Sequence, residues 1–352
     1  MIQRMTTPDE AGKSDAPEEV NRPWSMRVLV TGSVGHLGEA ILRSLAQSEH
    51  EAIGIDILAS PFTDAVGSIV ERDFVAGCMA GVDAVIHTAT LHKPHVATHS
   101  RQDFVDTNVT GTLNLLEEAS LAGVRCFVFT STTSAFGAAL VPAAGAPAAW
   151  ITEAVTAIPR NIYGVTKTAA EDLCQLFQRR EGLPCIVLRT SRFFPEEDDN
   201  KAQRSAYEDA NAKANEFLFR RVDLEDAVSA HLLAMERAPA IGFGRYIVSA
   251  TTPFLPADLA ALREDAAAVV RRRVPACESE YRRRGWRLFP SIDRVYVNSK
   301  ARDELGWRPR YDFARIVAQV KAGEPLGSGL ARVVGAKGYH AAVFAEGPYP
   351  VE

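Results

Sequence analysis

The chain has 352 residues, of which 47% are hydrophobic and 24% charged, and its formal net charge at pH 7 is −5. This length is enough for a large core, in one domain or in a domain with an appended lobe, and the acidic balance argues against a broad nucleic-acid-binding surface. The five cysteines are scattered without a CxxC pair, which is typical of a reducing compartment, so we expect a cytoplasmic protein. No apolar run approaches the roughly 18 residues needed to span a membrane, so we expect neither a nucleic acid nor a membrane as partner.

Residues 1–25 are polar, acidic and contain proline, without the apolar centre of an export signal. They predict a disordered tail, with the folded chain starting at Met26. Beyond it, short β-branched runs alternate with helical periodicity. Strands are expected at 27–31, 51–56, 83–89, 126–131 and 184–190, and helices at 37–46, 104–122 and 162–180. This order predicts the α/β class with a doubly wound parallel sheet.

The pattern changes after Thr190. Residues 191–217 are charged and irregular, which indicates a lid or insertion, and residues 224–238 form an amphipathic helical pattern. We therefore assign the sheet domain to 26–190 and a smaller substrate-binding portion with a C-terminal tail to 191–352, part of which returns to the sheet.

A glycine-rich stretch, VTGSVGHLGEA, joins the first strand to the first helix. Gly32 permits a tight turn, Gly35 permits close approach to a pyrophosphate, and Gly38 permits close packing of helix on strand. The helix N-terminus then presents unpaired N–H groups to phosphates. Asp56 ends the second strand about two dozen residues later, near the roughly 20 expected for an acid that binds ribose hydroxyls. No arginine follows it, so the sequence favours NAD over NADP and predicts residues 26–190 to be NAD-binding.

Tyr163 and Lys167 form a Y-x-x-x-K pair within the helix expected at 162–180. Positions four apart lie on one helical face, so the ammonium group is predicted to lie near the phenol. A nearby cation and an oxidised nicotinamide ring both favour phenolate and would lower the tyrosine pKa from about 10. The phenolate can then accept a hydroxyl proton while a hydride passes to the cofactor.

Several stretches in order, including VTGSVGHLG, VIHTAT, FTSTTSAFG, YGVTK and NSKARDELGWRPRYDF, resemble the extended short-chain dehydrogenase/reductase family, in its NAD-dependent epimerase/dehydratase group. The resemblance runs from Met26 to about Phe313 and implies a Rossmann fold, with Thr132 hydrogen-bonding the reacting oxygen beside Tyr163 and Lys167. It also implies that NAD is bound by Gly32, Gly35, His36, Leu37, Gly38, Asp56, Ile57, Asp73, Phe74, Thr88, Ala89, Thr90, Asn108, Tyr163, Lys167 and Thr190. For Asn108, a helix cap or a backbone tie is an equal alternative.

The same resemblance bears on the reaction. Family dehydratases carry an Asp-Glu pair where this chain has Thr133 and Ser134, which argues against sugar dehydration and assigns these two side chains to substrate contact. The asparagine of nucleotide-sugar epimerases falls on Arg192, which could pair with a substrate carboxylate or serve as an ordinary ion-paired arginine. Their Arg-Asp pair falls on Asn215-Glu216. Arg283 resembles a C-terminal arginine site, although Trp286 replaces the usual aspartate.

The stretch LHKPHVATHS holds His92, His95 and His99. Pro94 interrupts any helix that would align them, so we expect no metal site, although zinc ligation and plain loop residues are alternatives to substrate contact by His92. Tyr339 and His340 could fold over the pocket or a neighbouring subunit. The helical segments 108–118 and 163–177 pair across a two-fold axis in this family, which predicts a homodimer.

The leading hypothesis is an NAD-dependent oxidoreductase or epimerase that acts on a hydroxyl of a sugar or sugar nucleotide, with Tyr163 as base. A single-pass dehydrogenase or reductase of a small hydroxy or keto acid is the main alternative. A catalytically silent NAD-binding sensor is the alternative from another class, against which the intact Thr132, Tyr163 and Lys167 argue.

Overall fold

The computed structural model describes residues 25–198 and 200–338, so nearly all of the tail predicted at 1–25, together with Tyr339 and His340, lies outside the described residues. A seven-stranded parallel sheet in the order β3-β2-β1-β4-β5-β7-β8 forms its centre. The strands are β1 (Arg27–Thr31), β2 (Glu51–Asp56), β3 (Ala65–Val66), β4 (Ala84–His87), β5 (Cys126–Thr132), β7 (Cys185–Thr190) and β8 (Phe243–Val248). The doubly wound α/β fold predicted from the sequence is confirmed.

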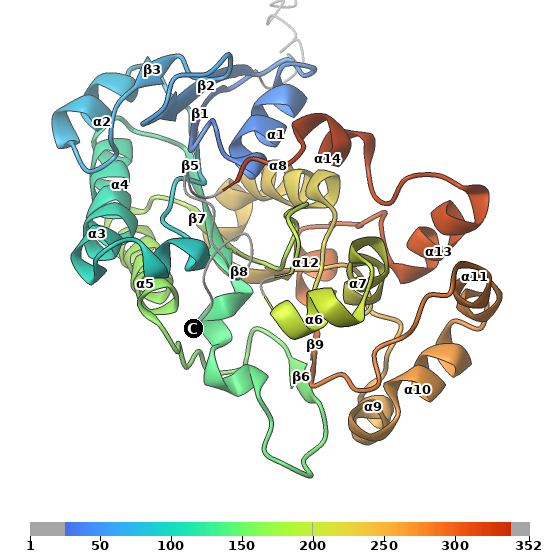
Figure 1. Cartoon of the computed structure of the whole chain (residues 1–352). Coiled ribbons are helices and arrows are strands. Elements are labelled where there is room, and N and C mark those ends of the chain that lie inside the picture. The colour runs from blue at the N-terminus through green and yellow to red at the C-terminus, as the bar shows by residue number, and fades with distance from the viewer. Residues whose placement is uncertain (1–24, 199, 339–352) are drawn as a thin grey trace, which may run out of the picture.

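Helices cover both faces of the sheet (Figure 1). One core packs α1 (His36–Leu45), α8 (Leu224–Ile241), α12 (Ser299–Glu304) and α14 (Gly329–Val334) on the sheet. The other packs α2 (Arg72–Cys78), α4 (Gly111–Leu121) and α5 (Ile162–Glu181), with α3 (Arg101–Val105) nearby. Alternation along β1 divides its side chains between the two layers: Val28 and Val30 enter the first core and Leu29 the second.

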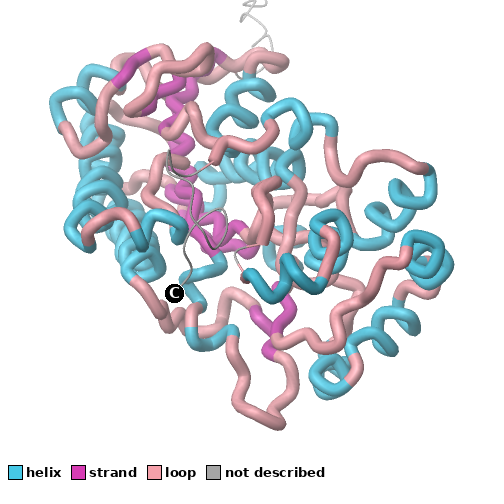
Figure 2. Tube along the Cα trace, viewed as in Figure 1, coloured by secondary structure: helices cyan, strands magenta, loops and turns pink. Residues whose placement is uncertain are grey.

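A smaller lobe with its own apolar core lies beyond the sheet (Figure 2). It contains α6 (Lys201–Ala206), α7 (Asp209–Glu216), α9 (Leu259–Glu264), α10 (Ala266–Arg273), α11 (Cys277–Arg284) and α13 (Phe313–Ala322). Two short strands, β6 (Ala149–Ile151) and β9 (Arg294–Tyr296), pair in parallel beside it. The residues after 190 also supply β8 and α8 to the sheet layers. None of the helices in the described part of the chain is long and apolar enough to cross a membrane.

Candidate active site

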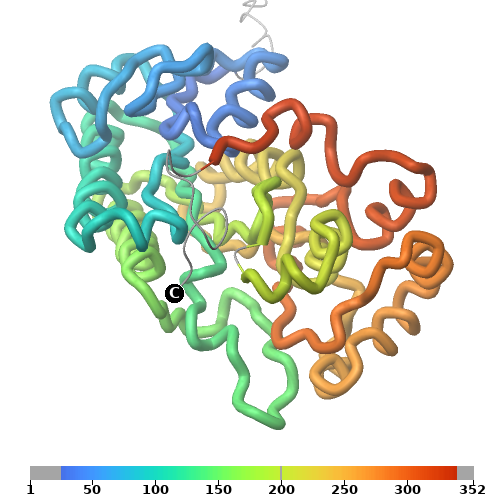
Figure 3. Tube along the Cα trace, in the orientation of Figure 1, coloured from blue at the N-terminus to red at the C-terminus, as the bar shows by residue number. Residues whose placement is uncertain are grey.

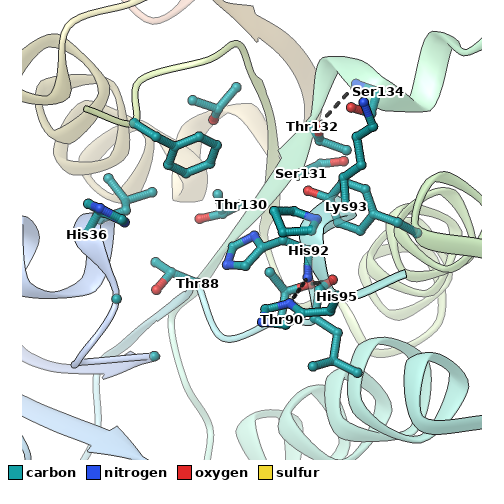
Figure 4. Close-up of a pocket in the computed structure, with 18 of the residues that line it drawn as sticks. His36, Thr88, Thr90, His92, Lys93, His95, Thr130, Ser131, Thr132 and Ser134 are labelled. Atoms are coloured by element: carbon teal, nitrogen blue, oxygen red, sulfur yellow. Dashed lines mark hydrogen bonds between the residues drawn. The ribbon is translucent and has the colours of Figure 1, made fainter. Parts of the chain in front are cut away.

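A cavity of about 910 Å³ opens at the carboxyl ends of the strands, which is where ligands bind in open α/β sheets. Six strands of the sheet (β1, β2, β3, β4, β5 and β7) deliver residues to its wall where each strand ends. Predicted site residues in the wall are Gly32, Gly35, His36, Leu37, Asp56, Ile57, Thr88, Ala89, Thr90, His92, Thr132, Thr133, Ser134, Tyr163, Thr190 and Arg192. Figure 4 shows part of this wall, with residues from β5 facing those that follow β4.

The glycine loop has the geometry of a phosphate cradle. Gly32 lies at φ +74°, and a Cβ at Gly38 would lie 2.0 Å from the Gly32 carbonyl oxygen, so the loop and helix approach as only glycine permits. Gly35 precedes α1 without a side-chain cap, which leaves the first N–H groups of the helix available to an anion. The Asp56 carboxylate accepts the Val34 N–H at 3.0 Å, which ties the loop to the end of β2. These residues fit a dinucleotide.

The far end of this cradle differs from the prediction. Asp73 and Phe74 lie within α2 and do not line the cavity; Ser68 and Ile69 line it instead. The reason is that β3 ends at Val66, so the residues directly after it reach the carboxyl edge of the sheet. The Phe74 ring packs beneath Gly67, where a Cβ would lie 2.5 Å from ring carbons.

Thr132 and Tyr163 meet in the cavity. Asn161 caps α5 by accepting the Gly164 N–H at 3.0 Å, which places Tyr163 in the first turn beside the end of β5. The Thr132 side chain favours the phenolate form of Tyr163, and both residues line the cavity. Thr132 Oγ1 also accepts the Ser134 N–H at 3.1 Å, so its hydroxyl is held in place from the backbone (Figure 4).

Lys167 lies behind this pair and is buried. Its ammonium group is 4.0 Å from the centroid of the Phe129 ring, and the side chain lies outside the residues that line the cavity. Burial lowers the pKa of Lys167 to about 7, against the opposing charge of Glu171.

Burial also raises the pKa of Tyr163 to about 12, against the opposing effect of the Thr132 side chain. The lowered tyrosine pKa that the sequence predicted is therefore not a property of the chain by itself. The prediction included an oxidised nicotinamide ring beside the phenol, and in the protein alone desolvation has the larger effect.

His92 projects into the cavity beside these groups, with its ring centroid 6.4 Å from that of Tyr163 and 6.1 Å from that of Phe194. Burial lowers its pKa to about 3, so the imidazole is neutral at physiological pH. His95 Nδ1 accepts the His92 N–H at 2.9 Å within the 3₁₀ turn Lys93–Ala97 (Figure 4). No group of three or more metal-ligating side chains occurs in the described ranges, so the zinc alternative finds no support there.

Asn108 has the structural role that the sequence left as an alternative. Its side chain accepts the Leu91 N–H at 2.8 Å and donates to the Leu91 carbonyl at 3.0 Å and to Thr166 at 3.1 Å. It thereby ties the loop after β4 to α5, and it does not line the cavity. Asn108 also accepts a hydrogen bond from the Thr90 hydroxyl at 2.9 Å, and Thr90 does line the cavity.

The arginines of the C-terminal portion are arranged differently from the prediction. Arg192 reaches the cavity but donates to the Glu197 carbonyl at 2.8 Å and lies 3.6 Å from the Asp198 carboxylate, so protein groups already engage it. Arg283, which the resemblance placed at the substrate site, does not line the cavity. It lies on α11, is 56% exposed and pairs with Glu280 at 2.8 Å, one helical turn away.

Arg220 and Arg294, which we did not predict, line the cavity together with Arg192 and Tyr296. The buried Glu216 pairs with Arg220 at 2.7 Å. Glu216 is one of the two residues that fall where the family has its Arg-Asp pair, and it supports an arginine that lines the cavity. Pairing of β9 with β6 brings in Arg294, and this long-range strand pair has no signal in the local sequence.

A segment from the far end of the chain closes one side of the cavity. We call residues Gly335–Gly338 the C-terminal strap. The N–H groups of Lys337 and Gly338 donate to Glu196 Oε1 at 3.0 and 3.2 Å, and His36 Nε2 contacts the same oxygen at 2.9 Å. Lys337 also pairs with Glu39 of α1. Figure 3 shows the red end of the tube beside the blue start of the fold.

Comparisons with known proteins identify the family of the chain. The model of the NAD-dependent epimerase/dehydratase family matches residues 28–246, more than half of the chain. The uncharacterised UDP-glucose epimerase YtcB of Bacillus subtilis (strain 168) is 27% identical over 186 residues, 47% of this chain and 55% of that protein. A 3-beta-hydroxysteroid dehydrogenase of Mycolicibacterium neoaurum is 36% identical over 118 residues, 31% of this chain and 32% of that protein. The chain thus spans about half of the first relative and about a third of the second.

A solved structure shows the same fold. It is a short-chain dehydrogenase/reductase superfamily protein of Agrobacterium tumefaciens with bound NAD, matched with a TM-score of 0.60 and 23% identity over 84% of this chain and 97% of that one. The family match and the glycine cradle together lead to one assignment: the chain belongs to the NAD-dependent epimerase/dehydratase family, with NAD as its cofactor.

Proposed function

We propose that this enzyme oxidises a hydroxyl of a sugar or sugar nucleotide by hydride transfer, with Tyr163 as the base. The observation that carries the proposal is that Thr132 and Tyr163 line the wall of a single cavity that also contains the glycine cradle. A substrate hydroxyl placed between these two side chains could donate its proton to Tyr163 while Thr132 fixes its oxygen.

Bound NAD supplies the hydride acceptor. Gly32, Gly35 and the start of α1 would hold its pyrophosphate, and Asp56 would accept hydrogen bonds from its ribose. Because burial raises the pKa of Tyr163 to about 12, the phenolate needs support from Thr132 and from the charge of Lys167. In the oxidation, the tyrosine oxygen would accept the substrate proton, and NAD would supply the acceptor for the hydride; reduction would reverse both transfers.

Two side chains in the cavity wall narrow the type of reaction further. Thr133 and Ser134 line the cavity at the positions of the dehydratase acids, and neither can protonate a leaving hydroxyl as a carboxylic acid does. We therefore favour an epimerase, which would use the transfer twice on one substrate, or a dehydrogenase, which would use it once. The sugar-nucleotide epimerase and the steroid dehydrogenase among the relatives illustrate both outcomes.

Arg220 and Arg294 support a second candidate, a dehydrogenase of a small hydroxy or keto acid. Both residues line the cavity, although Arg220 pairs with Glu216 and Asp198 and Arg294 pairs with Asp293. A planar guanidinium binds carboxylates and phosphates in the same paired geometry. An anionic group on the substrate is common to both candidates. It would be a diphosphate in a sugar nucleotide and a carboxylate in the small acid.

We also infer a homodimer through α4 and α5, in cytoplasmic protein. These helices leave Leu121 75% exposed, Val165 49% exposed and Leu176 48% exposed, which supports a covered face. Size measurement in solution, with Leu176→Glu as the disrupting variant, tests the dimer separately from the chemistry. A wild-type monomer would contradict it.

A panel of sugar nucleotides, free sugars and small hydroxy acids, monitored by NADH absorbance and by product analysis, tests the reaction. An epimerase would convert substrate with retained NAD and no net NADH, a dehydrogenase would give stoichiometric NADH, and a silent sensor would only bind. Tyr163→Phe should lower turnover by roughly 10²–10⁴-fold while NADH still binds. Tyr207→Phe, in the C-terminal lobe, is the matched control. Full turnover in Tyr163→Phe would refute the proposed base.

A further inference from the structure

A buried carboxylate, that of Glu171, lies behind Thr132 and Tyr163. Glu171 is on α5, one helical turn after Lys167, and is 1% exposed. Its Oε1 accepts the Ser131 hydroxyl at 2.5 Å, and Arg189 of β7 donates to both carboxylate oxygens at 3.0 and 2.7 Å. Arg245 of β8 donates to Oε2 at 3.2 Å. The carboxylate thus joins α5 to three adjacent strands.

Two of these relations lead to the reacting groups. Ser131 immediately precedes Thr132 in β5, so the short Ser131–Glu171 hydrogen bond fixes the end of the strand that presents the Thr132 hydroxyl. On the other side, Glu171 shares a helical face with Lys167, and its charge opposes the desolvation of the buried ammonium group.

Among the described residues, the other groups around Lys167 do not offer a negative charge comparable with that of Glu171. His87 of β4 and His92 face it, and burial holds the pKa of both imidazoles well below the ordinary value, so both are neutral. Cys174 lies further along α5, and the Phe129 ring of β5 contributes only its quadrupole. Tyr163 is neutral until it loses its proton. Glu171 is therefore the carboxylate that favours a charged Lys167.

From this arrangement we propose that Glu171 is a positioning residue for the oxidation and reduction chemistry: it keeps Lys167 charged beside Tyr163, and through Ser131 it holds Thr132 in register. The inference rests on the proposed function of the Thr132–Tyr163 pair. A salt bridge needed only for folding would be complete with Arg189 and Arg245. The contact with Ser131 and the placement one turn from Lys167 extend the network toward the substrate.

Glu171→Gln and Ser131→Ala separate the two actions. Glu171→Gln keeps the shape of the side chain but removes its charge, so Lys167 should lose its proton at lower pH. The alkaline limb of the kcat profile should then move down by roughly one pH unit, which is about a tenfold loss at a fixed pH on that limb. Ser131→Ala keeps the charge, so it should lower kcat across the profile without moving the limb. Asp172→Asn is the matched control, because Asp172 also pairs with Arg245 but is 77% exposed.

An unmoved limb in folded Glu171→Gln would overturn the inference, as would an equal shift in Asp172→Asn. If Glu171→Gln does not fold, Glu171→Asp and Ser131→Ala decide. Glu171→Asp retains the charge at a greater distance and should move the limb part of the way, whereas wild-type profiles and rates in both would refute the proposal. Failure of the proposed function is distinguishable, because Tyr163→Phe would then remain active whatever Glu171 does.

Discussion

Substitution of Gly38 by alanine tests the cofactor cradle most directly. The added Cβ would lie 2.0 Å from the Gly32 carbonyl oxygen, against about 3.4 Å for ordinary contact, so the start of α1 and the loop must separate by about 1.4 Å. Overpacking of this kind costs about 1–3 kcal/mol. If that cost falls on the bound geometry, NADH binding weakens by roughly 5- to 150-fold at about 1.4 kcal/mol per tenfold.

Fluorescence titration with NADH measures the affinity, and thermal unfolding shows whether the variant is folded. Gly77→Ala is the control, because Gly77 is inside α2 and a Cβ there meets no atom within 4 Å. Alanine in a helix interior should stabilise the protein by roughly 0.5–1 kcal/mol and leave NADH binding unchanged. If Gly38→Ala bound NADH within twofold of wild type, the close approach would not be needed for the cradle.

Three further outcomes are expected. Thr132→Val should lower kcat by at least about tenfold whereas Thr132→Ser should retain most activity, since only valine lacks the hydroxyl; equal rates would contradict its role. Arg220→Met should raise KM for anionic substrates more than for neutral ones, and equal effects in steady-state kinetics would exclude an anion contact. Glu196→Gln should lower the unfolding temperature near neutral pH, because the carboxylate has a pKa of about 2, below the unfolded value of about 4.3. That difference should shrink as the pH falls from about 4 toward 2; a constant difference would contradict the electrostatic origin.

The sheet and the glycine loop were predictable because their signals are local. Short β-branched runs defined β1, β4, β5 and β7, and the loop before α1 follows directly from glycine spacing. The resemblance also predicted Thr132 and Tyr163 as site residues, and both line the cavity. Parallel strands end at one edge, so residues at the ends of β5 and at the start of α5 converge there.

Contacts that depend on long-range placement were not predictable. Arg283 has a suitable local sequence but lies on the outer side of α11, whereas Arg294 reaches the cavity through pairing of two short strands far apart in the sequence. The prediction that Asp73 lies at the cofactor site was not met, because the two-residue strand β3 is too short for the sequence to show where it ends. For Tyr163, the pKa depends on how deeply the phenol is buried, which a sequence motif does not specify.

The C-terminal strap gives the cavity a wall that is synthesised long after the glycine loop. His36 leaves the exit tunnel some three hundred residues before Lys337, so during synthesis the nucleotide cradle is completed on one side well before the other. We therefore expect nascent chains that end before Gly335 to release dinucleotide faster than the finished protein.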